Sequence, residues 1–215
     1  MADLSPSSLS LPFGSNLNLR HSANWMGTSR REVTTERWAG IQLLGCDVDG
    51  VLTDGSLTFD EAGRQIQTFY VRDGFGLVAA RRAGVKVAWI SGRASAVAQK
   101  RFDELSLDDC LLACDDKAAA LLELQGRYGF SPDQCCFIGD DIPDLAAFSV
   151  CGLRIAVADA EPIVAARSDY ITHARGGRGA VREVIDLMLA ARGYWDEMLQ
   201  MFEQPDGAPP ENLQR

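Results

Sequence analysis

The chain has 215 residues, of which 47% are hydrophobic, and its 30 acidic and 21 basic side chains leave a net charge of −9. This composition is typical of a globular protein, and the length suits one domain with a sizeable core. The negative charge disfavours nucleic acid or an anionic membrane surface as the main partner. No apolar run approaches the about 18 residues needed to cross a bilayer, so we expect no membrane partner.

Six cysteines lie mostly within or beside apolar runs, and no two of them form a C-x-x-C pair. Disulfide frameworks and zinc sites usually show such paired spacing, whereas isolated cysteines in apolar runs behave as small buried hydrophobes. The cysteines therefore indicate a reducing compartment, and we expect a cytoplasmic protein.

The two ends of the chain differ in composition from its middle. Residues 1–29 are rich in Ser, Asn and Pro, and they lack the basic start and apolar stretch of a secretory signal. We predict that residues 1–40 form a flexible leader and that residues 41–192 form the folded domain. Residues 193–215 are predicted to form a C-terminal tail.

The first predicted strand, residues 41–48, leads into the tetrad Asp47-Val48-Asp49-Gly50. Buried strands are short apolar runs, and carboxylates at their C-terminal ends lie where open α/β sheets bind ligands. The turn after this strand can aim both Asp47 and Asp49 at one ligand. One carboxylate could attack phosphorus while the other donates a proton to the leaving alcohol and then activates water. An acidic, solvated strand end is the alternative.

Residues 55–70 contain two β-rich runs around the acidic turn Asp60-Glu61-Ala62-Gly63. This pattern predicts a β-hairpin. Because the hairpin directly follows the first acidic tetrad, we expect it to overhang the site as a flap.

Beyond the hairpin, apolar strand-like runs alternate with helix-like segments, which indicates right-handed βαβ units. We therefore predict an α/β fold, a three-layer Rossmann-like parallel sheet with helices on both faces. Further strands are expected at residues 85–90, 109–113, 135–138, 153–157 and 169–171, and helices at 74–83, 94–104, 117–128, 143–148, 161–166 and 180–191.

Ser91 and Lys117 stand at the starts of two of these helices. Ser91 follows a strand and is placed like an N-cap, where backbone N–H groups favour a phosphate oxygen. Lys117 begins the next helix, where a cation gains nothing from the helix dipole. Phosphate binding would explain both positions, and an ordinary cap and a solvent-exposed lysine are the alternatives.

A second acidic cluster, Gly139-Asp140-Asp141-Ile142-Pro143-Asp144, follows the strand at residues 135–138. Its carboxylates should meet those of the first tetrad at the edge of the sheet, where they would repel one another without a cation. An oxygen-only ligand set suits Mg²⁺. We predict that Asp140 binds the metal directly and that Asp141 and Asp144 orient it from behind.

The order of these motifs resembles the haloacid dehalogenase (HAD) superfamily of phosphohydrolases. The resemblance implies that Asp47 is the nucleophile, forming an aspartyl-phosphate, and that Asp49 is the general acid and base. It further implies that Ser91 and Lys117 hold the phosphoryl group. Mg²⁺ would be bound by Asp47, by the backbone carbonyl of Asp49 and by Asp140.

Many members of that superfamily carry a cap domain between these motifs. Here the intervals are 42 residues (91 − 49) and 26 residues (117 − 91), and strands and helices already occupy both. We therefore expect no cap domain, and a neighbouring subunit would have to close the site against water.

Longer stretches are similar to the 3-deoxy-D-manno-octulosonate 8-phosphate (KDO 8-phosphate) phosphatases, among them Gly-Gly-Arg-Gly-Ala-Val-Arg-Glu at residues 176–183. That family is capless, Mg²⁺-dependent and homotetrameric, and acts in lipopolysaccharide sugar synthesis. The resemblance implies a phosphorylated 2-keto-3-deoxy sugar acid as substrate. The implied substrate contacts are Asp49, Tyr70, Val71, Arg72, Asp73, Gly74, Arg93, Arg101 and Lys117.

The arginines Arg72, Arg93, Arg101 and Arg178 could clamp the phosphate and the carboxylate of such a sugar acid through bidentate pairs. A sibling family that acts on nine-carbon sialic-type acid phosphates can carry Glu where Arg93 stands, so Arg93 favours KDO. A phosphatase for other sugar phosphates and a non-catalytic assembly module are the open alternatives. The complete set of catalytic groups argues against the assembly module.

The C-terminal tail contains an apolar stripe with helical spacing. A neighbouring subunit could bury this stripe, which would fit a homotetramer, and packing on its own subunit is the alternative. The stripe consists of Tyr194, Trp195, Met198, Leu199 and Phe202.

Overall fold

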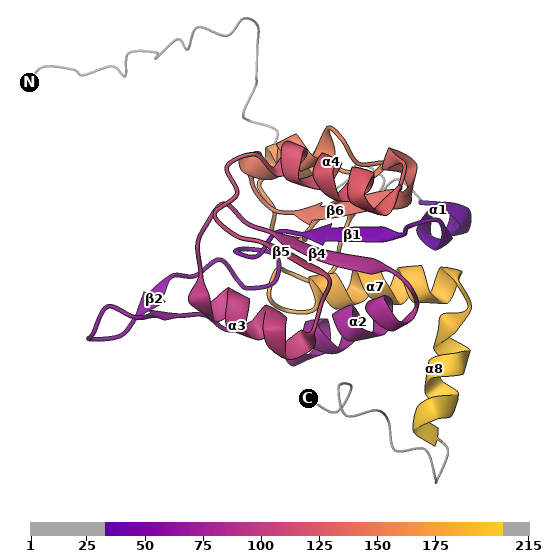
Figure 1. Ribbon diagram of the computed structural model, residues 1–215, viewed down its shortest axis with the longest axis horizontal. Helices are drawn as coiled ribbons and strands as arrows, with labels where there is room; N and C mark the ends of the chain where they lie inside the picture. The colour runs from indigo at the N-terminus through magenta and orange to yellow at the C-terminus, as the bar shows by residue number, and fades with distance from the viewer. Residues whose placement is uncertain (1–32, 204–215) are drawn as a thin grey trace, which may run out of the picture.

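The structure, a computed structural model, describes residues 33–203 (Figure 1). Six parallel strands form one sheet in the order β5-β4-β1-β6-β7-β8. The strands are β1 (Leu43–Cys46), β4 (Lys86–Ile90), β5 (Asp109–Leu111), β6 (Cys135–Gly139), β7 (Leu153–Ala156) and β8 (Tyr170–Ile171).

Helices cover both faces of this sheet, so the predicted three-layer α/β fold is confirmed (Figure 1). Helix α4 (Lys117–Tyr128) lies on one face together with α5 (Leu145–Phe148), which it contacts. Helices α2 (Val71–Arg82), α3 (Ala96–Leu105) and α7 (Ala180–Ala191) lie on the other. The remaining elements are α1 (Thr35–Ala39), α6 (Pro162–Ala165), α8 (Tyr194–Glu203) and the 3-10 turns η3 (Pro132–Gln134) and η4 (Ile142–Asp144).

The centre of the sheet sets the position of the site. Strands β1 and β6 are fully buried, and Gly45 leaves room for the ring of Phe137, because a Cβ at Gly45 would lie 2.7 Å from that ring. After β1 the chain continues to β4 on one side, whereas β6 lies on the other side. Ligands of open α/β sheets bind at such a switch point, beyond the carboxyl ends of the strands.

The predicted hairpin is present and projects from the sheet (Figure 1). Strand β2 (Thr58–Phe59) pairs antiparallel with β3 (Gln65–Ile66). The apolar side chains of the hairpin, Leu57, Phe59 and Ile66, are exposed. In the described residues no cap domain interrupts the path from β1 to β6, as expected.

Several boundaries differ from those predicted. Helix α1 lies inside the range predicted as leader, and its Trp38 is buried and packs edge-to-face on Tyr170 at 5.3 Å. Residues 1–32 and 204–215 lie outside the described residues. None of the described helices has both the length and the apolar character that a membrane crossing requires.

The apolar stripe of the tail lies on α8 and packs partly on its own subunit. Met198 is buried, and the ring of Phe202 lies 5.9 Å from that of Phe75. Leu199 nevertheless stays 49% exposed and Phe202 40% exposed. Packing on the same subunit therefore accounts for only part of the stripe.

Candidate active site

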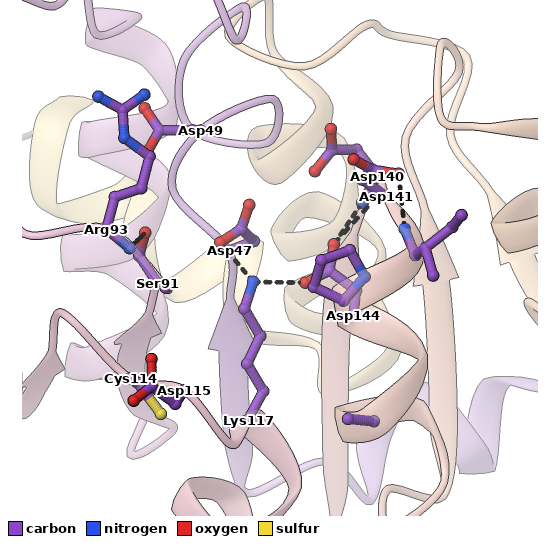
Figure 2. Close-up of a pocket in the computed structure, with 14 residues that line it drawn as sticks. Asp47, Asp49, Ser91, Arg93, Cys114, Asp115, Lys117, Asp140, Asp141 and Asp144 are labelled. Atoms are coloured by element: carbon purple, nitrogen blue, oxygen red, sulfur yellow. Dashed lines mark hydrogen bonds and ion pairs between the residues drawn. The ribbon is translucent and has the colours of Figure 1, made fainter.

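A pocket of about 580 Å³ opens beyond the carboxyl ends of the central strands (Figure 2). The loops after β1, β4 and β6 and the start of α4 build it. Its lining includes Asp47, Asp49, Ser91, Arg93, Lys117, Asp140, Asp141 and Asp144. The pocket thus brings together every residue predicted for catalysis and for the metal.

Gly50 allows the loop after β1 to lie against the loop after β6. Its φ is +99°, a conformation that L side chains rarely adopt. A Cβ at this position would overlap the carboxylate of Asp140. Glycine is therefore required if Asp47 and Asp140 are to lie in one pocket.

The side chain of Lys117 is buried between two carboxylates (Figure 2). Its Nζ lies 2.7 Å from Oδ1 of Asp47 and 2.6 Å from Oδ1 of Asp144. The N-cap of α4 is Asp116, which accepts the backbone N–H groups of the first turn. The solvent-exposed alternative for Lys117 is therefore wrong.

Charge is not balanced in this cluster. Asp47, Asp140 and Asp144 offer carboxylate oxygens that all lie within 4.8 Å of one another. Burial, followed by repulsion from Asp47, raises the pKa of Asp140 to about 8. Burial and Asp144 likewise raise the pKa of Asp47, although Lys117 opposes that shift. Burial would lower the pKa of Lys117, but Asp47 and Asp144 outweigh it and raise that pKa.

The residues present fit a divalent cation. Oδ1 of Asp140 is buried and has no hydrogen-bond partner among the described residues, a costly state for a carboxylate oxygen. A hard cation would satisfy this oxygen and offset the repulsion among the acids. The predicted choice of Asp140 as a direct ligand agrees with this geometry.

Asp144 is engaged on both of its oxygens. Oδ1 accepts from Lys117, and Oδ2 accepts the backbone N–H groups of Asp140 and Asp141 at 2.8 and 3.2 Å. The Asp141 side chain is exposed and accepts the N–H of Ile142 at 2.7 Å. Asp144 is thus placed to orient Lys117 and the loop of Asp140.

Asp49 lies across the pocket from the acidic cluster, beside Arg93 (Figure 2). Its Oδ1 accepts a hydrogen bond of 2.8 Å from Nε2 of Gln67, and its Oδ2 lies 3.9 Å from Nε of Arg93. Both Asp49 and Arg93 are partly exposed, so a ligand in the pocket can reach them.

The prediction that Ser91 caps the following helix is wrong. Helix α3 begins at Ala96, and its N-cap is Ser95, whose hydroxyl accepts the N–H of Ala98 at 3.1 Å. Ser91 lies in the loop before that cap, where it is buried and its Oγ accepts the N–H of Arg93 at 3.3 Å. It still lines the pocket, so its predicted role in phosphate binding keeps a structural basis.

The other predicted substrate contacts do not line this pocket. Tyr70 and Arg72 line a second pocket of about 590 Å³, together with Arg178. The exposed Val71 begins α2. Arg101 pairs with Glu104 at 3.2 Å. Within one subunit, therefore, only Arg93 of the four proposed arginines lines the candidate pocket.

Asp73 and Gly74 are buried in α2, which begins three residues earlier than predicted, at Val71. Asp73 accepts the backbone N–H groups of Gly179 and Arg182 at 3.2 and 2.7 Å and so caps α7. At Gly74 a Cβ would lie 2.6 Å from the guanidinium of Arg101. Both residues have a packing role in this structure.

The run at residues 176–183 supports the loop after Asp49. A Cβ on Gly176 would overlap the carbonyl oxygen of Gly50, and one on Gly177 would lie 2.5 Å from the backbone nitrogen of Asp54. The Gly177 N–H also donates to the carbonyl of Val51 at 2.9 Å. Because Gly176 and Gly177 have no side chains, their backbone can lie directly on the loop.

Sequence reasoning missed several residues of the site. Gln67 and Ser95 escaped notice because a glutamine after a hairpin strand and a serine before a helix carry no catalytic signature, although Ser95 precedes a helical pattern and is readable as a cap. Gln67 contacts Asp49, and Ser95 contacts Gln67, but neither lines the pocket. The lining residues that were not predicted for the site are Gly92, Cys114, Asp115, Ile142, Pro143 and Ala146.

A family model of haloacid dehalogenase-like hydrolases matches residues 115–185. The chain is 40% identical over 157 residues to the 3-deoxy-D-manno-octulosonate 8-phosphate phosphatase KdsC of Salmonella typhi, which covers 73% of this chain and 84% of that protein. The chain belongs to the KDO 8-phosphate phosphatase family. As a member of this family of HAD-like hydrolases it is an enzyme of the phosphatase class, as the sequence motifs predicted.

Solved structures of the KDO 8-phosphate phosphatase family share this fold. One is the Moraxella catarrhalis enzyme in complex with magnesium ion, phosphate ion and KDO, with a TM-score of 0.76 and 39% identity over 79% of this chain and 97% of that one. Another is the cobalt-bound form of the Haemophilus influenzae enzyme. Its TM-score is 0.72, and it is 37% identical over 80% of this chain and 98% of that one. Related phosphatases thus bind divalent metal ions.

Proposed function

We propose that this enzyme hydrolyses KDO 8-phosphate to KDO and phosphate through an aspartyl-phosphate intermediate. The observation that carries the proposal is the convergence of Asp47, Asp49 and Lys117 on one pocket. A nucleophile, a proton donor and a cation for the phosphoryl group are thereby available to one substrate. The names of the relatives support the choice of sugar acid.

In the first step an oxygen of Asp47 forms a bond to phosphorus while the ester P–O bond breaks. The electron pair of that bond stays on the sugar oxygen, which takes the proton of Asp49. In the second step Asp49 accepts a proton from water as the water oxygen attacks phosphorus, releasing phosphate and the free carboxylate of Asp47. Lys117 and Ser91 bind the phosphoryl oxygens in both steps.

Mg²⁺ is the cofactor that we propose for this pocket. Asp47, the backbone carbonyl of Asp49 and Asp140 would hold it, while Asp144 and Asp141 fix the loop behind Asp140. When bound, the ion would neutralise the negative charge that the phosphoryl group brings to the acidic cluster.

Arg93 supports a sugar acid as substrate because its guanidinium lines the pocket beside Asp49. Tyr70 and Arg72 line the second pocket of the same subunit. Since these residues do not line the active-site pocket of their own subunit, their predicted substrate contacts would be made in a neighbouring subunit. We therefore propose a homotetramer.

The experiment compares kcat/KM for KDO 8-phosphate, a nine-carbon sialic-type acid 9-phosphate and simple sugar phosphates. We expect KDO 8-phosphate to give the highest value, and a higher value for any other substrate would reassign the specificity. Asp47→Asn should abolish turnover of all of them because the swap removes the nucleophile and keeps the shape. Asp49→Asn should cost about 10²–10⁴-fold, the usual worth of a positioned acid and base. Activity of Asp47→Asn within about tenfold of the parent would refute the aspartyl-phosphate.

A further inference from the structure

Gln67 links the hairpin flap to the proposed general acid. It directly follows β3 and is partly buried, and its Nε2 lies 2.8 Å from Oδ1 of Asp49. Arg93, the other side chain beside Asp49, instead follows β4. The hairpin therefore supplies a side chain that contacts the site.

A second hydrogen bond fixes the orientation of the Gln67 amide. The hydroxyl of Ser95 accepts the N–H of Ala98 at the start of α3 and donates its own hydrogen to Oε1 of Gln67 at 2.5 Å. Since Oε1 is used as the acceptor, the amide nitrogen must face Asp49. Ser95 is buried, so the orientation is anchored in the folded domain.

This orientation determines which oxygen of Asp49 can carry the acidic proton. An amide nitrogen donates hydrogen bonds and does not accept them, so a proton on Oδ1 would have to point away from Gln67 and would leave Oδ1 a weaker acceptor for this contact. Oδ2 lies on the side of Arg93, at 3.9 Å from its Nε, where the pocket is open. The proton therefore belongs on Oδ2, facing a bound substrate.

We propose that Gln67 is a positioning residue that places the acidic proton of Asp49 on Oδ2 and that Ser95 holds Gln67 in the orientation required. Gln67 itself does not touch the reacting atoms. This inference rests on the proposed role of Asp49 in protonating the leaving oxygen. It predicts that Gln67 matters for the first step only where the leaving group needs a proton.

The test compares two kinds of substrate in the variant Gln67→Leu. One is p-nitrophenyl phosphate, whose leaving group is a stable anion and needs no proton. The other is an alkyl phosphate, taken as whichever of KDO 8-phosphate and the simple sugar phosphates the parent enzyme hydrolyses fastest. The measurement is kcat/KM, which reports the steps up to formation of the aspartyl-phosphate and not its hydrolysis. We expect kcat/KM for the alkyl phosphate to fall about 10²-fold, the lower end for a positioned acid. For p-nitrophenyl phosphate we expect a fall of less than about threefold.

Gln65→Leu is the matched control, because Gln65 lies two residues earlier in the same hairpin and its Nε2 has no hydrogen-bond partner among the described residues. It should leave both substrates unchanged. Ser95→Ala, which leaves Gln67 in place but frees its amide to rotate, should show the same discrimination between substrates as Gln67→Leu, to a smaller degree. Because it alters a different element, it tests the proposal even if Gln67→Leu folds poorly.

An equal loss on both substrates in Gln67→Leu and Ser95→Ala, or no loss on either, would overturn the proposal. Failure of the proposed function gives a different result: the parent enzyme would then show no p-nitrophenyl phosphate hydrolysis that depends on Asp47. The two failures are therefore distinguishable.

Discussion

Gly50 shows how one residue without a side chain can shape the proposed metal site. Its positive φ and its contact with Asp140 both exclude a Cβ. Because Oδ1 of Asp140 is the buried carboxylate oxygen without a partner among the described residues, a shift of Asp140 should be felt first as weaker cation binding.

We predict that Gly50→Ala raises the Mg²⁺ concentration needed for half-maximal activity by about tenfold or more, which corresponds to about 1.4 kcal/mol of binding free energy. A titration of activity against Mg²⁺ measures this shift. Gly63→Ala is the control, because Gly63 also has a positive φ, of +73°, but a Cβ there meets nothing within 4 Å. An equal shift in both variants would assign the effect to backbone strain alone.

Burial and hydrogen bonding shift the pKa of Asp73 in opposite directions. Burial raises its pKa from 3.8 to about 6, although the N–H groups of Arg182 and Gly179 act in the opposite direction. The folded protein therefore holds this proton more tightly than the unfolded chain does. The corresponding stability is fully present below pH 3.8 and is lost as the pH rises through about 6.

We predict that the free energy of unfolding of the parent, minus that of Asp73→Asn, falls by about 2 kcal/mol between about pH 4 and about pH 7. Asparagine does not titrate, and groups common to both proteins cancel in the difference. Urea unfolding of both proteins across this pH range measures it. A difference that grows with pH would mean that the hydrogen bonds to α7 outweigh burial.

Among the elements, the segment before α7 has two tasks. The backbone N–H of its Gly179 donates to Asp73 of α2, as does that of Arg182 in α7, which anchors the start of the helix. Its glycines Gly176 and Gly177 support the loop after Asp49. Glu183, on the first turn of α7, holds the strand end beside it by accepting the N–H groups of His173 and Ala174. The segment thus joins the end of the domain to its first catalytic loop.

We predict that Gly176→Ala lowers the free energy of unfolding by about 1–3 kcal/mol, as at other overpacked sites. We also expect it to lower kcat. The added methyl must displace the backbone of Gly50, which cannot move without moving Asp49. Gly126→Ala, at a helical site where a Cβ meets nothing within 4 Å, should instead be neutral or stabilising by up to about 1 kcal/mol. Thermal unfolding and steady-state kinetics of both variants test this contrast.

The sequence predicted the parallel sheet and the catalytic pocket because both depend on local patterns. The bounds of α4 and α7 match the predicted residues 117–128 and 180–191, because each begins and ends at recognisable changes in the pattern. By contrast, α2 begins three residues before the predicted start, because its N-cap Tyr70 makes no side-chain cap hydrogen bond and is not a residue that signals a helix start.

Contacts between distant segments could not be predicted from the sequence. The bond from Gln67 to Asp49, the cap that Asp73 forms on α7 and the contact of Gly176 with Gly50 each join residues that no local pattern relates. The motif at residues 176–183 was recognised by family resemblance, but only the packing shows what its glycines do.

At the scale of the whole molecule, five of the nine exposed large apolar side chains of the described residues lie on the hairpin and on α8. Leu57, Phe59 and Ile66 are at least half exposed on the hairpin, and Leu199 and Phe202 are partly exposed on α8. Association would remove this surface from water. It would also supply the neighbouring subunit that the predicted substrate contacts of Tyr70 and Arg72 require.

We predict a homotetramer in solution, and that truncation after Arg192 weakens catalysis although every catalytic residue remains. Light scattering of the parent and steady-state kinetics of both forms are the measurements. A fully active monomer, or a truncated enzyme with unchanged kinetics, would contradict this assembly.

The contact of Gly176 with Gly50 spans 126 positions of the chain (176 − 50). The acids and the lysine of the pocket all precede residue 145, so a nascent chain carries them long before it carries their support. During synthesis the loop after Asp49 lacks this support until the segment at residues 176–177 has left the ribosome. We therefore expect the growing chain to stay without phosphatase activity until nearly the whole domain has emerged, and prematurely terminated chains to be inert.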